Sequence, residues 1–303
     1  MSLESARAAL DAFAATLATF DRAALERRLD GAPLGSLREP LLAATRPKQR
    51  GASGVFYTPA PIAAYQARRI ELHLVRDLGL AGGLASPRVL VVDPACGAGA
   101  HLAALLSRAP SIAGRLVGID VDEPALVATR LSLERSHRAR PVLRLADALS
   151  SAALADLADR AADGGALVLV GNPPYEGFSA PRSADERRRL DDWIAPLAPA
   201  WGLTKHRLGE LYVRFVRAAL EAVERAGAGV VSFVTDRKWT VGRSFPSMRE
   251  GVLRAFDRVV VDDLHGEVHG EREDESAFGG PSRGGVRCGL AIVTCVRARS
   301  RVA

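Results

Sequence analysis

Lysine is scarce in this chain, and arginine supplies nearly all of its positive charge. Only three of the 41 basic residues are lysines, and the formal net charge is +6. A basic chain is biased toward polyanions such as nucleic acids. A composition rich in arginine and alanine can equally reflect the base composition of a genome, so charge alone leaves nucleic-acid binding open.

Cysteines and long apolar runs are also scarce. The three cysteines (Cys96, Cys288 and Cys295) are odd in number and widely spaced, which argues against a disulfide framework. No cysteine or histidine pair has the spacing of zinc ligands, so we expect no metal site. No apolar run approaches the roughly 20 residues that cross a bilayer, and the first four residues lack a signal-peptide pattern. We therefore expect a cytoplasmic protein without a membrane segment.

The pattern along the chain divides it into two parts. Apolar residues recur at helical spacing between residues 4 and 30, and Asp30–Pro33 ends this pattern. Residues 31–54 are mixed and end in a basic, glycine-containing stretch that is typical of a linker. We predict a small helical N-terminal extension and linker over residues 1–50 and one large α/β domain over residues 51–303.

Short apolar runs alternate with helical stretches in the larger part. The seven runs cover residues 89–92, 116–119, 142–145, 166–170, 229–234, 259–261 and 290–293. Near-continuous apolar strands separated by helices indicate a buried, mostly parallel sheet. We predict a seven-stranded, Rossmann-like α/β fold, in which ligands bind beyond the carboxyl ends of the strands.

The first run leads into the segment Asp93–Leu102, which contains the glycines Gly97 and Gly99. A glycine-rich turn from a strand into a helix lets the backbone approach a ligand closely, and the helix N-terminus offers free N–H groups. Leu102 stands where a dinucleotide-binding motif has its third glycine, which disfavours NAD. A tight turn without a ligand is the alternative interpretation.

Acids follow the next two runs. Asp120 comes after the second run, and its carboxylate can accept both ribose hydroxyls of a nucleoside cofactor. Asp122 suits the N-cap of the helix that begins near Pro124, although Asp120 can serve as that cap as well. Asp147 comes after the third run, where a carboxylate can accept from the amino group of an adenine.

The fourth run ends in Asn172-Pro173-Pro174-Tyr175. Asp93, Asp120, Asp147 and Asn172 follow one another at intervals of 27, 27 and 25 residues. The amide oxygen of Asn172 and the carbonyl of Pro173 can each accept one N–H of a poorly nucleophilic aromatic amine and localise its lone pair. The prolines stiffen the backbone, and Tyr175 offers a flat face for a base. A proline-rich surface turn is the alternative.

These residues resemble the gamma-class N6-adenine DNA methyltransferases. The order of motifs agrees with that family, because Tyr57-Thr58-Pro59 precedes Asp93–Gly99 and Asn172–Tyr175 follows it. The segments 211–215, 232–235, 245–249 and 263–266 are similar to the methylase core of type IIG and single-polypeptide type I restriction–modification enzymes. The resemblance covers residues 54–297.

The resemblance implies site-specific adenine methylation of DNA with S-adenosylmethionine as the cofactor. It implies that Asn172, Pro173, Pro174 and Tyr175 are the catalytic residues and that the target adenine is flipped out of the duplex. The implied cofactor-binding residues are Tyr57, Thr58, Pro59, Asp93, Pro94, Ala95, Cys96, Gly97, Gly99, Asp120, Val121, Asp147 and Ala148. Tyr57, Thr58 and Pro59 would fold over the methionine end, and Phe278 is the candidate for a second aromatic that stacks on the base.

The chain also departs from that family. His101 stands where the family often has phenylalanine, and we expect no nuclease, helicase or target recognition domain in the chain. DNA is the expected partner, and sequence specificity would come from a specificity subunit or a separate C-terminal region. Arginines in the loop after Tyr175 (Arg182, Arg187, Arg188 and Arg189) can meet phosphates or form a solvated helix face. A methyltransferase for a protein glutamine amide or RNA, and a cofactor-binding subunit without turnover, remain alternatives.

Overall fold

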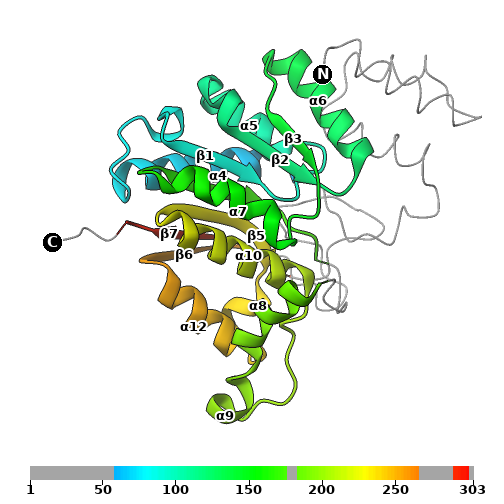
Figure 1. The fold of residues 1–303 in the computed structure, drawn as a ribbon, viewed down its shortest axis with the longest axis vertical. Coiled ribbons are helices and arrows are strands. Elements are labelled where there is room, and N and C mark those ends of the chain that lie inside the picture. The colour runs from blue at the N-terminus through cyan, green and yellow to red at the C-terminus, as the bar shows by residue number, and fades with distance from the viewer. Residues whose placement is uncertain (1–57, 176–182, 266–288, 300–303) are drawn as a thin grey trace, which may run out of the picture.

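The computed structural model describes residues 58–175, 183–265 and 289–299 (Figure 1). The N-terminal extension predicted over residues 1–50 lies outside them, as do Tyr57, Arg182 and Phe278. None of the helices in these three segments combines the length and the apolar character that a bilayer-spanning helix requires.

A seven-stranded sheet forms the centre of the described part, with the order β3-β2-β1-β4-β5-β7-β6. Its strands are β1 (Val89–Asp93), β2 (Leu116–Asp120), β3 (Val142–Leu145), β4 (Ala166–Gly171), β5 (Gly229–Asp236), β6 (Arg258–His265) and β7 (Leu290–Arg297). The first five strands are parallel, whereas β7 lies antiparallel between β5 and β6. The prediction of a seven-stranded, mostly parallel α/β sheet is confirmed.

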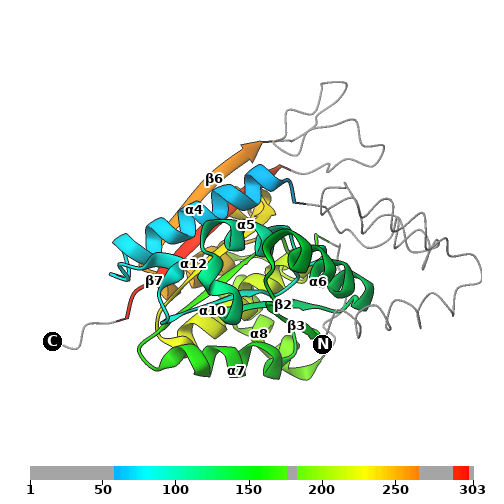
Figure 2. The same cartoon turned by 90° about the horizontal axis from the view of Figure 1, so that it is seen from above.

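Helices cover both faces of this sheet, as Figures 1 and 2 show. Val89 and Val91 of β1 face a core shared with α4 (Ala60–Arg76), α5 (Ala100–Arg108) and α6 (Glu123–His137). Leu90 and Val92 face the opposite core, shared with α7 (Ser151–Ala162), α10 (Leu211–Ala226) and α12 (Pro246–Ala255). Successive side chains of a strand point to opposite faces, so a strand with no polar alternation needs an apolar layer on each side.

Other helices lie between these elements along the chain. They are η3 (Gly83–Ala85), η4 (Pro110–Arg115), α8 (Ala184–Ile194), α9 (Leu197–Trp201) and α11 (Lys238–Val241). The edge strands β3 and β6 are partly exposed, whereas β1, β4 and β5 are buried along their whole length. This difference matches their positions at the margins and in the centre of the sheet.

Helix α8 corrects the expectation that the arginines after Tyr175 lie in a loop. Ser183 stands at its N-cap and accepts the N–H of Glu186 at 3.1 Å. Serine followed three residues later by glutamate is a capping-box pattern, so the sequence did contain a signal for this helix. Arg188 pairs with Asp185, and Arg189 pairs with Glu221 of α10, so both guanidinium groups have carboxylate partners.

Arginines also close helix C-termini at the amino edge of the sheet. Arg299 donates to the carbonyls of Ala162 and Ala226, at the ends of α7 and α10. Arg297 donates to the carbonyl of Ala255 at the end of α12. The last carbonyls of a helix have no partner within the helix and carry partial negative charge, so a guanidinium satisfies them both geometrically and electrostatically.

Candidate functional site

The turn after β1 presents its backbone at the carboxyl edge of the sheet. Gly97 and Gly99 have φ angles of 50° and 81°, and Gly99 is the N-cap of α5. A Cβ at Gly99 would lie 2.7 Å from Cγ2 of Thr129, whereas one at Gly97 would enter open space. Gly99 is therefore required by packing against α6, and Gly97 leaves the backbone accessible to a ligand.

The carboxylate of Asp120 is fixed beside this turn. Its Oδ2 accepts the N–H of Gly97 at 2.7 Å, and its Oδ1 accepts the N–H of Asp122 at 2.9 Å. Burial raises the pKa of Asp120, and these two hydrogen bonds partly oppose the rise. Each carboxylate oxygen retains a second lone pair, so the group can also accept ligand hydroxyls. The adjacent Val121 is 63% exposed and offers an apolar surface beside that carboxylate.

The structure places the neighbouring acids at turns. Asp122 occupies the N-cap position of α6, as predicted, but its side chain makes no capping hydrogen bond. Oδ1 of Asp147 accepts the N–H of Leu149 at 3.0 Å in the turn from β3 to α7. Because β2 and β3 are parallel neighbours, Asp120 and Asp147 lie at the same edge of the sheet.

The segment Asn172–Tyr175 leaves the end of β4 without regular structure. The hydroxyl of Tyr175 donates a hydrogen bond to Oδ1 of Asn172. The ring of Tyr175 lies 6.3 Å from the ring of Tyr212, centroid to centroid, at an interplanar angle of 50°. Tyr175 also packs against a small apolar cluster formed by α4, β5 and β7. Asn172 is therefore held beside an aromatic side chain that is itself anchored on two sides.

Asp93 joins the glycine turn to the Asn172 segment. It is fully buried, and its Oδ1 accepts the N–H of Ala95 at 3.1 Å. A Cβ on Gly171 would lie 3.0 Å from the same oxygen. Gly171 thus leaves room for the carboxylate, which binds the start of the turn and lies beside the residue that precedes Asn172.

Two buried residues that the sequence analysis did not assign to the site form a series of contacts that ends at Asp93. Nδ1 of His101 lies 3.3 Å from Oδ2 of Asp93, and its Nε2 lies 3.0 Å from Oε1 of Gln66 on α4. The signal available in the sequence was a histidine on the apolar side of a short helix, next to Leu102. A polar residue at such a position needs buried partners, but sequence alone does not identify them.

Helix α4 brings the predicted cofactor segment to this edge. Pro59 is its N-cap, and the carbonyl of Pro59 accepts the N–H of Ile62 at 3.0 Å. Ile62 packs with Val234 near the carboxyl end of β5, so α4 begins at the carboxyl edge. Thr58, which is buried, lies there as well, whereas Tyr57 lies outside the described residues.

Cys96 is not arranged as a nucleophile. Burial raises the pKa of its thiol well above the usual value, and the charges of Asp93 and Asp120 add to the rise. The thiolate is the reactive form of cysteine, so this side chain stays protonated. Cys96 instead contributes its backbone, because its N–H donates to the carbonyl of Ile119 at 3.0 Å and links the turn to β2.

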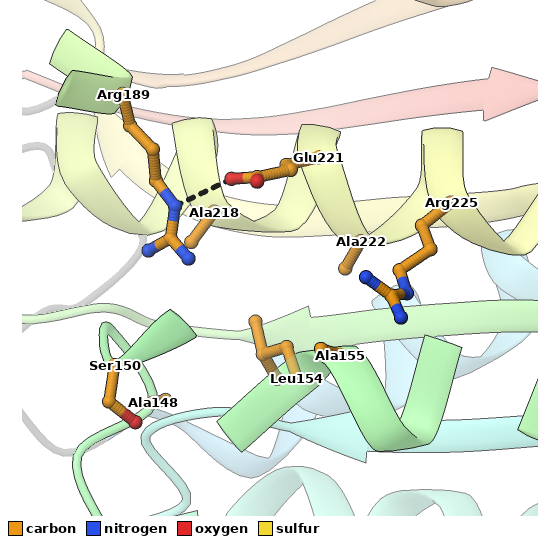
Figure 3. A pocket seen from close by; sticks show the side chains of 9 residues that line it. All are labelled: Ala148, Ser150, Leu154, Ala155, Arg189, Ala218, Glu221, Ala222 and Arg225. Carbon is orange, nitrogen blue, oxygen red and sulfur yellow. Dashed lines mark ion pairs between the residues drawn. The ribbon is translucent and has the colours of Figure 1, made fainter. Parts of the chain in front are cut away.

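Ala148 lines a cavity of about 130 Å³ between α7 and α10 (Figure 3). Small side chains form most of its wall, and the Arg189–Glu221 ion pair closes one end. Ligand pockets are usually about 300–1,000 Å³, so this cavity is too small for a nucleoside. The carboxyl edge, where the polar residues gather, remains the candidate site. Within the described ranges, no cluster of His, Cys, Asp and Glu is arranged to hold a metal ion.

Among the comparisons with known proteins, only those with solved structures found matches, and at low sequence identity these show the fold of the chain. No protein-family model and no curated protein matches this chain. A cryo-EM structure of a DrdV–DNA complex is 23% identical, with a TM-score of 0.70 over 94% of this chain and 30% of that chain. A nuclease-deletion mutant of the type ISP restriction–modification enzyme LlaGI, bound to a DNA substrate mimic, is 17% identical, with a TM-score of 0.68 over 93% and 27%.

A third structure matches over most of both chains. It is a putative class I S-adenosylmethionine-dependent methyltransferase from Listeria monocytogenes, 14% identical, with a TM-score of 0.53 over 91% of this chain and 72% of that chain. The described part of the chain therefore has the Rossmann-like fold of S-adenosylmethionine-dependent methyltransferases. The chain spans less than a third of the length of the DrdV and LlaGI chains.

Proposed function

We propose that this chain methylates N6 of adenine in DNA, using S-adenosylmethionine, as the methylase part of a restriction–modification system. The observation that supports this proposal is the position of Asp93, whose Oδ1 accepts the N–H of Ala95 in the glycine turn and lies in the space that a side chain at Gly171, directly before Asn172, would need. Asn172 would thus offer an acceptor for an amine next to a backbone turn suited to a nucleoside cofactor. We assign the activity to the domain predicted over residues 51–303.

The residues around the turn fit an S-adenosyl group. The open space above Gly97 leaves room for a ligand against the backbone. Asp120, which is held by two backbone N–H groups, would accept the ribose hydroxyls. The exposed Val121 would contact the adenine ring, Asp147 would accept from its amino group, and Thr58 and Pro59 would cover the methionine end. When bound, the cofactor supplies a methyl group on a sulfonium.

Asn172 and Pro173 would hold the target amine. The lone pair of an aromatic amine is delocalised into its ring, which makes the nitrogen a poor nucleophile. Oδ1 of Asn172 and the carbonyl of Pro173 would each accept one N–H and localise that lone pair on the nitrogen. The two prolines restrict the backbone of this segment, so both acceptors would act by positioning and electrostatic preorganisation.

Tyr175 would form one wall of the pocket for the flipped base. Stacking of a base on an aromatic side chain contributes roughly 1–3 kcal/mol. In the structure the Tyr175 hydroxyl occupies Oδ1 of Asn172, the atom that the amine needs. The amine would take the second lone pair of this oxygen as the base enters, while the ring keeps its packing against the neighbouring apolar cluster.

The likeness to two structures determined with DNA supports DNA as the partner. The net charge of +6 agrees with a polyanionic substrate. A specificity subunit or a separate recognition region would then choose the target sequence. Binding measurements on the purified chain can test whether DNA is its partner and whether a specificity subunit is needed for sequence preference.

The proposal is tested by incubating the chain with methyl-labelled S-adenosylmethionine and DNA, RNA or a glutamine-containing protein substrate in separate reactions. We expect label on DNA, recovered as N6-methyladenine by mass spectrometry of the digested nucleosides, and none from the Asn172→Ala variant. Label on RNA or on a glutamine amide would replace the DNA assignment. Cofactor binding without label on any substrate would favour a subunit that has no turnover of its own.

A further inference from the structure

Five buried polar side chains connect the sheet, α4 and α5 beneath the candidate site. We propose that His101 is a positioning residue for methyl transfer, which fixes through Asp93 the spacing between the glycine turn and Asn172. This inference rests on the proposed function, because the turn would hold the cofactor and Asn172 the target amine. His101 itself lies beneath the turn and is 4% exposed.

The contacts run continuously from Thr294 on β7 to Asp93 at the end of β1. Oγ1 of Thr294 lies 3.2 Å from Oγ of Ser232. Nε2 of Gln66 donates to the carbonyl oxygen of Ser232 at 2.9 Å and approaches its hydroxyl at 3.3 Å. Gln66 then meets Nε2 of His101, and Nδ1 of His101 meets Asp93. The run thus ties β7, β5, α4 and α5 to the end of β1.

The partners determine which atoms of this run carry protons. The Ser232 carbonyl can only accept, so the nitrogen of the Gln66 amide must face it and the oxygen must face His101. Nε2 of His101 therefore donates to Gln66. Nδ1, on the other side of the ring, lies 3.3 Å from Oδ2 of Asp93.

An entirely apolar arrangement would avoid the cost of burying these groups. Buried polar groups are costly unless their hydrogen bonds are made, and apolar replacements of similar size are often tolerated. A buried polar network, by contrast, limits the arrangements that its members can adopt. The network ends at Asp93, whose Oδ1 accepts the N–H of Ala95 and fills the space that a side chain at Gly171 would need. The network would therefore fix the glycine turn relative to Asn172, and this relative position would determine the reaction.

Methyl transfer depends on this relative position more than cofactor binding does. Binding can adapt to a small shift of the turn, whereas in-line attack needs the amine and the methyl group aligned, and a 1 Å displacement can lower a rate about 100-fold. Loss of His101 should therefore lower kcat and leave the cofactor Kd nearly unchanged. If His101 affected stability alone, the protein that remains folded would keep the wild-type kcat as well as the wild-type Kd.

His73 provides a matched control on α4. It is a second buried histidine, 5% exposed, and its Nδ1 lies 2.6 Å from Oδ2 of Asp77. It occupies the last turn of α4, at the end away from the site. His101→Phe and His73→Phe thus each remove a buried histidine that contacts an aspartate. The aspartate beside His101 is Asp93, at the glycine turn, whereas the one beside His73 is distant from that turn.

The test combines kinetics with hydrogen exchange on the full chain. We expect His101→Phe to lower kcat at least tenfold at saturating DNA and cofactor, to change the calorimetric Kd of S-adenosylmethionine less than threefold, and to speed amide exchange in the peptide covering residues 166–175 without ligands. His73→Phe should keep kcat within twofold and leave that peptide unchanged. Equal kinetic and exchange behaviour of the two variants would overturn the proposal.

Gln66→Met keeps the test decisive if His101→Phe does not fold. It preserves the His101–Asp93 contact and removes the acceptor for Nε2, so we expect kcat to fall three- to tenfold with faster exchange in the same peptide. Wild-type kcat and exchange in Gln66→Met would overturn the proposal. If the wild-type chain transfers no methyl group to DNA but the variants still speed exchange at residues 166–175, the proposed function fails and the positional coupling stands.

Discussion

The hydroxyl of Tyr175 donates a hydrogen bond to Oδ1 of Asn172. Under the proposed mechanism that oxygen also accepts an N–H of the target amine. The tyrosine hydroxyl already takes one of the two lone pairs of this oxygen before a base arrives, so it restricts the directions from which the amine can approach. Base entry would therefore add a second donor at Asn172 together with stacking on Tyr175, and the two contributions of the tyrosine can be separated by substitution.

Tyr175→Phe retains the aromatic face and removes the competing hydroxyl. A hydrogen bond in a folded protein contributes about 0.5–1.5 kcal/mol net, so we expect KM for DNA to fall by up to about tenfold with little change in kcat. Tyr175→Ala loses the stacking face as well and should raise KM by a similar or larger factor. Steady-state kinetics measure both, and a higher KM for Tyr175→Phe would show that the hydroxyl helps to hold the base.

Asn172→Ala removes one of the two acceptors proposed for the amine. Loss of a single preorganised hydrogen-bonding group typically costs about 100- to 1,000-fold in kcat, and we expect a loss of that size here. Under the proposal Asn172 faces the target amine and not the cofactor, so calorimetry should give a Kd for S-adenosylmethionine within threefold of wild type. Unchanged turnover on adenine-containing DNA would exclude the mechanism.

The strands could be predicted from the sequence because each contains a short apolar run, and the runs of the central strands β1, β4 and β5 are buried along their whole length. The end of each strand therefore also located Asp93, Asp120, Asp147 and Asn172 at one edge. The antiparallel insertion of β7 between β5 and β6 could not be predicted, because an apolar run carries no information about strand direction or neighbours.

The contacts within the site could not be predicted from the sequence either. His101 and Gln66 are 35 residues apart, and Gln66 and Ser232 are 166 apart; only the packing of α4 against α5 and β5 brings them together. The Tyr175–Asn172 hydrogen bond depends on a side-chain rotamer that a four-residue motif does not specify. Long-range polar partners and rotamers are products of tertiary packing, whereas strand positions follow from local burial.

Asp120 should make cofactor binding sensitive to acid. Burial raises the pKa of its carboxyl, so this group takes up a proton at a higher pH than an ordinary aspartate as the solution is acidified. The protonated form loses its charge-assisted hydrogen bonds to the ribose hydroxyls, and affinity should weaken as the pH falls through that raised pKa. Calorimetry at a series of decreasing pH values should show this decline for wild type and a nearly flat profile for Asp120→Asn.

The buried ion pair between Arg214 and Glu186 should be important for stability. Nη1 of Arg214 lies 2.9 Å from Oε1 of Glu186, and the side chains are 1% and 3% exposed. Nε and Nη2 of Arg214 also donate to the carbonyl of Gly209. Arg214→Met leaves a buried carboxylate without its cation, so we expect the free energy of unfolding in urea to fall by about 3–5 kcal/mol.

A solvent-exposed pair supplies the control for this measurement. Arg254 and Glu250 form an i,i+4 pair on α12 with both side chains exposed, and Arg254→Met should cost less than about 1 kcal/mol. The double variant Arg214→Met/Glu186→Leu should recover part of the loss, because it removes the orphaned charge together with its partner. A similar cost for Arg214→Met and Arg254→Met would contradict this assignment.

The arginines that bind helix carbonyls divide the positive charge of the chain into two populations. Arg299 and Arg297 use their guanidinium groups on the carbonyls of Ala162, Ala226 and Ala255. Lysine offers a compact ammonium group without the planar fork of arginine, so a chain-wide exchange of arginine for lysine would preserve formal charge and lose these contacts. The guanidinium groups of Arg297 and Arg299 are thus engaged by the fold, and cations without such carbonyl partners are freer to respond to salt when the chain meets a polyanion.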